Sequence, residues 1–175
     1  MGRTSLTLLT GLLGVTFSIR ADDAKPLPHP HDPVLQAEHL KMLDLISDAD
    51  ITHTAVRDGA WSDKATWKDG KTPGEGANVL IPKGKSVTLD SVASAIRGLR
   101  VDGELNFTPD RDTGLAVDTI VVSPDGKLIV GTAEKPIAAN RRATITFTDR
   151  GPLDTRHDPA PLGRGLIAQI GRAHV

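Results

Sequence analysis

Short apolar runs that alternate with polar residues, each followed by a turn built on glycine, make up most of the chain after residue 77. The alternation indicates half-buried β-strands, because successive side chains of a strand point to opposite faces. The turn glycines are Gly84, Gly103 and Gly126, at spacings of 19 and 23 residues. A loose repeat of this length is typical of one coil in a stack of β-coils. The pattern therefore predicts an all-β fold.

Two all-β architectures fit this pattern. In one, the coils stack into a β-roll or β-helix-like domain; in the other, each strand–turn–strand unit is a hairpin of an antiparallel sandwich. The repeat favours stacked coils, and the sandwich stays as the alternative. Further glycines are expected at turns or close backbone approaches, namely Gly70, Gly74, Gly98 and Gly131. The predicted strands are residues 79–81, 87–89, 96–101, 105–107, 120–122, 128–130 and 143–148.

The first 21 residues have the features of a secretory signal peptide. Arg3 supplies a positive start, residues 5–18 form an apolar run, and Ala21 is a small residue before the expected cleavage site. Spanning a membrane takes about 18 apolar residues or more, so we expect cleavage rather than anchoring. Residues 22–51 are then expected to be a Pro-rich linker with a short α-helix that begins at Asp32 and ends near Ser47.

Charge and cysteine content narrow the class of protein. The chain has 21 Lys and Arg against 22 Asp and Glu, a formal net charge of -1, which argues against nucleic-acid binding. The absence of cysteine excludes disulfides, thiolate metal sites and cysteine nucleophiles. With the signal peptide, this composition is typical of a bacterial exporter. We therefore expect a secreted, extracellular or periplasmic protein that has no membrane attachment after cleavage.

One stretch of the sequence resembles a known family. Residues 59–67 read GAWSDKATW, residues 79–90 read VLIPKGKSVTLD, residues 99–105 read LRVDGEL, and residues 126–132 read GKLIVGT. Their order and spacing over residues 52–149 resemble the G8 domain. The resemblance implies an extracellular all-β module that commonly precedes a parallel β-helix. It implies no catalytic residue, cofactor or metal site.

The C-terminal part of the sequence is expected to come from a longer protein. Residues 150–169 are predicted to begin a following module, which the resemblance would make a β-helix. Residues 170–175 read IGRAHV, the translation of one frame of a common sequencing adapter. We therefore interpret these six residues as an artefact, and we expect the natural protein to continue beyond about Gln169.

The two tryptophans are the strongest candidates for ligand contact. Trp61 and Trp67 bracket a polar turn, and Asp63 lies between them. As a binding site, the rings would stack on sugars while Asp63 and Lys64 supplied hydrogen bonds. As packing residues, they would hold a loop over the end of the β-stack in a chain with few other aromatic residues.

Three further motifs are weighed against simpler interpretations. His29 and His31 are metal-ligating residue types but lie in the Pro-rich linker, so we expect a solvated linker. Residues 110–114 resemble part of a calcium loop but lack its third oxygen position and distal Glu, so we expect an acidic turn. Residues 106–108 form a glycosylation sequon on a predicted strand, where modification is not expected.

The sequence leads to three hypotheses about function. The first is an extracellular module that binds a polysaccharide or another cell-surface ligand. The second is the N-terminal part of a polysaccharide-degrading, hyaluronidase-like β-helix enzyme. The third is a structural cap for a β-helix, whose partner would be the C-terminal β-helix of the full-length chain.

Overall fold

The computed structural model describes residues 44–93, 95–152 and 163–168. The chain divides into two units, residues 1–32 and 33–175, and every described residue belongs to the second. The expected signal peptide, the adapter-like residues 170–175 and most of the linker therefore lie outside the described residues. No helix in the described part of the chain is long and apolar enough to cross a membrane.

The described chain is built almost entirely from β-strands, as the sequence predicts. In chain order, the strands are β1 (His53–Thr54), β2 (Gly59–Ala60), β3 (Asn78–Ile81), β4 (Ser86–Leu89), β5 (Ile96–Val101), β6 (Glu104–Phe107), β7 (Thr113–Val122), β8 (Lys127–Val130), β9 (Ala143–Phe147) and β10 (Gly165–Ala168). Four short 3-10 helices accompany them, namely η2 (Asp44–Ile46), η3 (Asp48–Asp50), η4 (Lys64–Thr66) and η5 (Lys68–Gly70).

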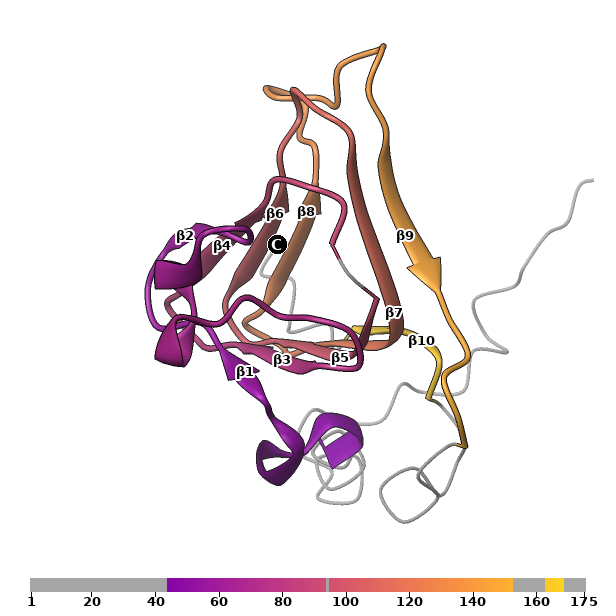
Figure 1. The fold of residues 1–175 in the computed structure, drawn as a ribbon. Coiled ribbons are helices and arrows are strands. Elements are labelled where there is room, and N and C mark those ends of the chain that lie inside the picture. The colour runs from indigo at the N-terminus through magenta and orange to yellow at the C-terminus, as the bar shows by residue number, and fades with distance from the viewer. Residues whose placement is uncertain (1–43, 94, 153–162, 169–175) are drawn as a thin grey trace, which may run out of the picture. The chain divides into compact units, whose positions relative to one another are not determined.

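From β1 to β8, successive strands alternate between two parallel sheets, and β9 and β10 both join the first of these. One sheet has the order β1-β3-β5-β7-β10 with β9 also paired to β7, and the other has the order β2-β4-β6-β8. Each strand therefore pairs with a strand one coil away and not with its sequence neighbour (Figure 1). The hairpin alternative is wrong, because the two strands that flank each glycine turn lie in different sheets. The stacked β-roll or β-helix-like arrangement is confirmed.

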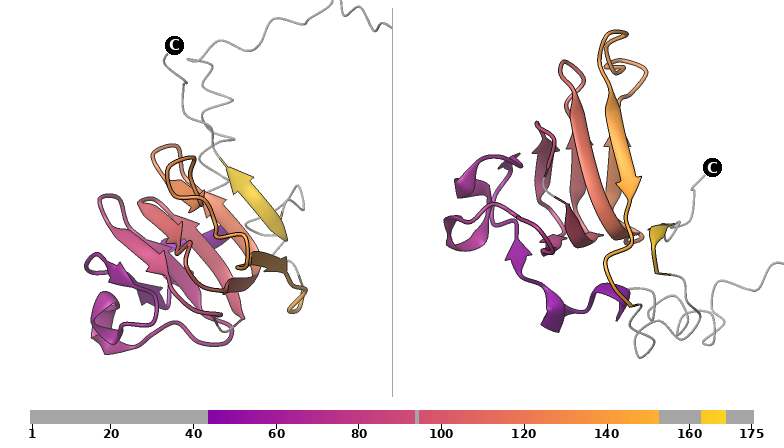
Figure 2. Two further views of the ribbon diagram at one scale, coloured as in Figure 1. Left: turned by 90° about the horizontal axis from the view of Figure 1, so that it is seen from above. Right: turned by 45° about the vertical axis from the view of Figure 1, so that its right-hand side comes forward.

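The register shows the length of each coil directly. Val79 pairs with Leu99, and Leu99 pairs with Ile120, so successive coils are 20 and 21 residues long on this side. Figure 2 shows the coils following one another in chain order, from the purple first coil to the orange strands β8 and β9. Inward side chains of neighbouring coils therefore lie over one another, and the three residues of this ladder are fully buried.

A third side of the stack comes from the first half of β7. This half pairs with β9, from Thr113 with Ala143 to Val117 with Phe147, whereas the second half pairs with β5 and β10 (Figure 1). Buried Asp118 lies between the two halves and accepts hydrogen bonds from the Thr148 hydroxyl (2.5 Å) and the Arg150 amide (3.1 Å). These bonds hold the end of β9 to the point where β7 changes partners.

The turn glycines have two different reasons to be glycine. At Gly103, a Cβ atom would fall against the carbonyl oxygens of Pro82 and Lys85 in the preceding coil. Gly126 approaches the Val101 carbonyl in the same way. The coils thus pass too closely for a side chain at these corners. Positive φ angles, which favour glycine, occur instead at Gly70, Gly84 and Gly131.

Two expectations differ from the structure. Gly98 lies inside β5 and not at a turn; a Cβ atom there would approach Asn78 Oδ1 at 2.8 Å and Ile46 Cδ1 at 3.0 Å, so close packing explains the glycine. The last residues of the expected α-helix, Asp44–Ile46, form a 3-10 turn, and the rest of that helix lies outside the described residues. Gly74 lies in the loop before β3 with open space where its Cβ would be.

Candidate functional site

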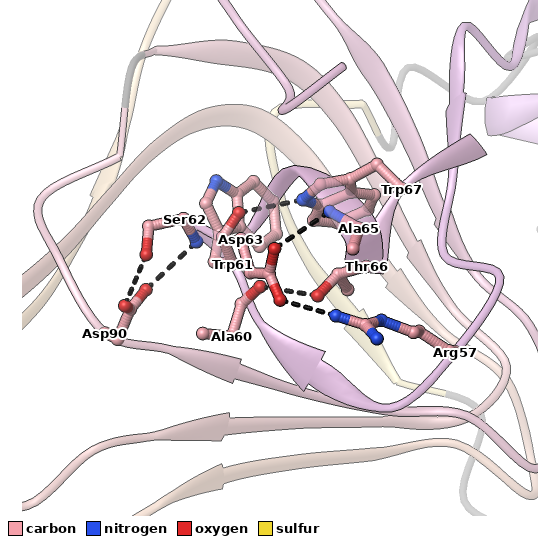
Figure 3. A network of polar contacts seen from close by, with 9 residues as sticks. All are labelled: Arg57, Ala60, Trp61, Ser62, Asp63, Ala65, Thr66, Trp67 and Asp90. Atoms are coloured by element: carbon pink, nitrogen blue, oxygen red, sulfur yellow. Dashed lines mark hydrogen bonds and ion pairs between the residues drawn. The ribbon is translucent and has the colours of Figure 1, made fainter. Parts of the chain in front are cut away.

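The first coil is covered by one loop, residues 57–70, which we call the cap loop. Trp61 and Trp67 pack edge-to-face within it, with ring centroids 5.0 Å apart and planes at 75° (Figure 3). The two residues are only 3% and 2% exposed. Trp67 Nε1–H donates a 2.8 Å hydrogen bond to the Trp61 carbonyl, which satisfies the one polar group of the buried indole.

The three residues predicted to bind a ligand lie close together, but the two tryptophans are not exposed for binding. The structure brings Trp61, Asp63 and Trp67 into one loop, but both indole rings point into the core. A sugar needs an exposed aromatic face to stack on, and burial leaves neither ring with one. The contacts of the two tryptophans are those of packing residues that close the end of the stack. In the sequence, their position beside a polar turn is compatible with both packing and ligand binding, so the sequence could not distinguish the two roles.

Asp63 faces solvent and holds the cap loop together. It accepts a 2.9 Å hydrogen bond from the Ala65 amide, which caps η4, and a 2.6 Å ion pair from Arg57 Nη2 (Figure 3). The Ala65 hydrogen bond, followed by the contact with Arg57, lowers the pKa of the Asp63 carboxyl below its usual value. Both carboxylate oxygens are already engaged, so Asp63 has a structural partner at each.

One further set of contacts ties the cap loop to the sheet, and another holds the loop to itself. Ser62 donates from its amide (3.1 Å) and its hydroxyl (2.6 Å) to the two carboxylate oxygens of Asp90, at the end of β4. Buried Thr66 donates its hydroxyl to the Ala60 carbonyl at 2.8 Å. All four residues are drawn in Figure 3. The loop is thus held to the end of β4 through Ser62 and closed on itself through Thr66, which keeps the tryptophans over the first coil.

A groove lies where the cap loop meets the start of β3. It has a volume of about 570 Å³ and is largely open to solvent. Its polar lining includes His53 of β1, Lys64 of η4, and Lys71, Thr72 and Glu75 of the loop before β3. Burial lowers the pKa of His53, and the nearby Lys71 ammonium lowers it further. Sequence reasoning missed this groove because its residues come from three separate segments.

A second, smaller hollow of about 300 Å³ lies on the third side of the stack. Small side chains line it, including Gly114, Ala116 and Thr144, with Asp112 and Arg142 at its edge. The Arg142 amide donates to Asp112 Oδ1 at 3.0 Å, so the carboxylate of this hollow already has a backbone partner. The hollow therefore has few polar groups that could bind a ligand.

The metal and calcium motifs give no assembled site in the part of the chain that the structure describes. No group of three or more His, Asp or Glu residues there could hold a metal ion. His29 and His31 lie outside the described residues. Asp110 accepts hydrogen bonds from the Thr108 hydroxyl at 2.9 Å and from Arg111 Nε at 3.3 Å. The Thr108 bond, followed by Arg111, lowers the pKa of the Asp110 carboxyl.

The sequon residue Asn106 lies on the outer face of β6. Its Nδ2 group donates to Glu104 Oε1 at 2.6 Å and contacts Ser86 Oγ at 3.2 Å. Phe107, between the two polar residues of the sequon, is buried in the core. The amide is therefore part of a polar ladder that runs across neighbouring coils.

The opposite end of the stack, formed by β8, β9 and β10, has no covering loop among the described residues. Val130 of β8 and Phe147 of β9 occupy inward positions, in register with Phe107 and Val117 one coil earlier. Phe107 and Val117 are 3% and 0% exposed, whereas Val130 and Phe147 are 43% and 44% exposed. Core positions of the last coil thus face solvent.

Comparison with known proteins identifies the family to which the chain belongs. A family model for the G8 domain matches residues 66–172, which is more than half of the chain. The chain belongs to the G8 domain family. The matched region begins inside η4, so β1, β2 and Trp61 of the first coil precede it. The predicted boundary at residue 149 separates β9 from β10, although both strands pair with β7 and both lie within the match.

Curated relatives of the G8 module are much longer proteins. Fibrocystin of Mus musculus is 35% identical over 103 residues, which covers 53% of this chain and 2% of that protein. Fibrocystin-L of Homo sapiens is 30% identical over 88 residues, covering 50% of this chain and 2% of that protein. The chain thus spans about 2% of the length of these relatives. No solved structure matches. These relatives are animal proteins and give no support to a bacterial source.

Proposed function

We propose that this G8 module acts outside the cell as the closed end of a longer stack of β-coils. In this role it covers the first core layer of the stack and presents an edge on which further coils continue. The observation that carries the proposal is the contrast between the two ends of the module. The inward residues next to the cap loop are buried, whereas three inward residues of the last coil, Val130, Phe147 and Leu166, are 43–50% exposed.

The side chains of the last coil support a continuing stack. Leu166 of β10 lies in register with Ile120, which is fully buried, yet Leu166 is 50% exposed. Together with Val130 and Phe147, it leaves an inward apolar position uncovered on each of the three sides of the stack. Exposed apolar surface of this kind marks an interaction site. A following coil would place its own inward residues directly over these three.

The backbone of the last coil supports the same interpretation. Lys127 N–H donates to Gly103 O at 2.8 Å, so in a parallel ladder the Leu128 and Val130 amides point away from β6. Thr148 N–H donates to Val117 O at 3.0 Å, so the Ile145 and Phe147 amides point away from β7. These amides have no partner strand among the described residues, and an edge with such donors is a template for another strand.

A fusion experiment tests the cap. The G8 module would be joined in front of a parallel β-helix whose own N-terminal cap has been removed, with coils of similar length. We expect the fusion to be soluble and monomeric, because the module covers the exposed core layer. The matched control carries Val130→Lys and Phe147→Lys, which place charge in the joining layer, and we expect it to aggregate. A wild-type fusion that aggregates like the capless β-helix would contradict the proposal.

Ligand binding is a second candidate function, and the groove beside the cap loop favours it. The sequence-based hypothesis of polysaccharide binding relied on tryptophan stacking, which burial removes. The groove offers a different kind of contact, because its lining is rich in charged and hydroxyl groups. A binding role at the closed end is compatible with continuation of the stack from the other end, since the two use separate residues.

A further inference from the structure

The groove beside the cap loop carries positive charge that is not neutralised locally. Lys64 and Lys71 line it, and neither has an ion-pair partner among residues 44–93, 95–152 and 163–168. Its one acidic lining residue, Glu75, is engaged at 2.6 Å by Arg150 Nη1. Two free ammonium groups beside a neutralised carboxylate favour an anion in the groove.

His53 adds a third group suited to an anion. The Thr52 hydroxyl donates its single proton to the Asn78 carbonyl at 3.1 Å and accepts the Asn78 amide at 3.0 Å. Thr52 Oγ1 also lies 2.8 Å from His53 Nδ1, and in the protonated ring Nδ1–H donates to this oxygen. The second ring nitrogen, Nε2, has no hydrogen-bond partner within the described part of the chain. Once protonated, it is a donor.

We infer that this groove binds an oxyanion group, a carboxylate or a sulfate, carried on an acidic polysaccharide. Lys64 and Lys71 supply charge-assisted hydrogen bonds, and protonated His53 supplies a further donor. The groove is largely open to solvent, so a linear polymer can enter and continue beyond it. The hydroxyl of Thr72 lines the same groove and is suited to a sugar hydroxyl. This inference rests on the second candidate function and does not depend on the cap role.

The charges around His53 make it a reporter of binding. Lys71 lowers the pKa of His53 in the empty groove, and Lys64 and Glu75 are the other charged groups of the lining. A bound oxyanion favours the protonated ring, so binding must raise the pKa of His53. Substituting Lys71 must also raise this pKa without any ligand, which shows independently that the two side chains are coupled.

The test follows the His53 ring by NMR in the full chain, with its signal assigned by its loss in His53→Gln. The protein would be titrated with a polyuronate oligosaccharide, with a neutral oligosaccharide of equal length and with inorganic sulfate. We expect the polyuronate to raise the pKa of His53, the neutral sugar to leave it unchanged, and sulfate to bind more weakly. Each of Lys64→Gln and Lys71→Gln should weaken polyuronate binding by about 5-fold, as expected for one solvent-exposed charged contact.

Lys68→Gln is the matched control, because Lys68 lies in η5 of the same cap loop but does not line the groove. It removes the same charge and should leave binding unchanged. Equal weakening by Lys68→Gln, or no weakening by Lys71→Gln, would overturn the site. Equal affinity for sulfate and polyuronate would overturn the polysaccharide, and binding of the neutral sugar would overturn the oxyanion. The fusion experiment is independent of these results, so the cap proposal and this one can fail separately.

Discussion

The first and last coils of the stack are made of the same kind of strand but end in opposite ways. At the first coil, the cap loop places Trp61 and Trp67 over the core, and Val87 and Leu89 of the neighbouring strand are fully buried. At the last coil, Val130, which is in register with Leu89 through Phe107, is 43% exposed, and Leu128, in register with Val87 through Leu105, is only partly buried. Strand pattern alone does not determine which end is sealed. Two aromatic side chains and a fastened loop make the difference.

The largest expected effect comes from opening the closed end. Trp67→Ala removes a fully buried ring and leaves a cavity, so we expect the free energy of unfolding to fall by about 3–5 kcal/mol. Chemical denaturation monitored by far-UV circular dichroism measures this loss. A change under about 1 kcal/mol would mean that the ring is not part of the core.

The close passage of one coil over the next can be tested at the Gly103 corner. Gly103→Ala forces a methyl group against two carbonyl oxygens, and we expect it to cost about 1–3 kcal/mol, as other overpacking changes do. Gly74→Ala is the control, because the new methyl group would meet no atom within 4 Å and the φ angle of Gly74 is not positive. Equal effects of the two changes, by denaturation, would contradict the stacking of the coils.

The open end should respond less to the loss of an aromatic ring. Phe147→Ala removes a side chain that is already 44% exposed, so we expect a loss of about 1 kcal/mol, well below that of a buried ring. The same substitution in a fusion that continues the stack should cost clearly more, because the following coil would bury Phe147. An equal cost in both settings would show that nothing packs on this residue.

The smallest effect is a pH dependence at the cap loop. The folded-state pKa of Asp63 lies below its unfolded value, so its contribution to stability is present above the unfolded pKa of about 4 and is lost as pH falls through the folded pKa. Asp63→Asn should therefore reduce the acid sensitivity of unfolding. Thermal melts of both proteins from neutral to acidic pH measure this, and identical profiles would contradict it.

The sequence predicted most of the strands because the alternation of apolar and polar side chains follows from the local geometry of a strand. The period-two runs expected from residue 79 to 107 and at 128–130 lie in strands, and Gly103 and Gly126 do sit at corners. The strand expected at 120–122 is only the end of β7 (Thr113–Val122), whose first half was not predicted and includes the last two residues of the acidic turn expected at 110–114. The sequence could not decide between stacked coils and hairpins, because the answer depends on which strands pair, and strand pairing is not determined by local sequence. The strands β1 and β2 were missed because two-residue strands carry no periodic signal.

The candidate site could be predicted less well than the fold. Trp61 and Trp67 were correctly singled out as a pair, but their spacing fits packing and stacking equally. The groove was invisible in the sequence because His53, Lys64 and Lys71 belong to three segments that only the coil geometry brings together. Isolated lysines in a sequence usually indicate only a solvated surface.

Amide hydrogen exchange on the unfused G8 module tests the difference between the two ends most directly. We expect the Trp67 indole N–H and the Trp61 amide, which donates to Thr88 O at 2.8 Å, to exchange only with global unfolding. The Val130 and Phe147 amides should exchange with little protection, since they point away from the neighbouring strands. Equal protection of the two pairs would contradict an open end, and with it the proposal that further coils continue from there.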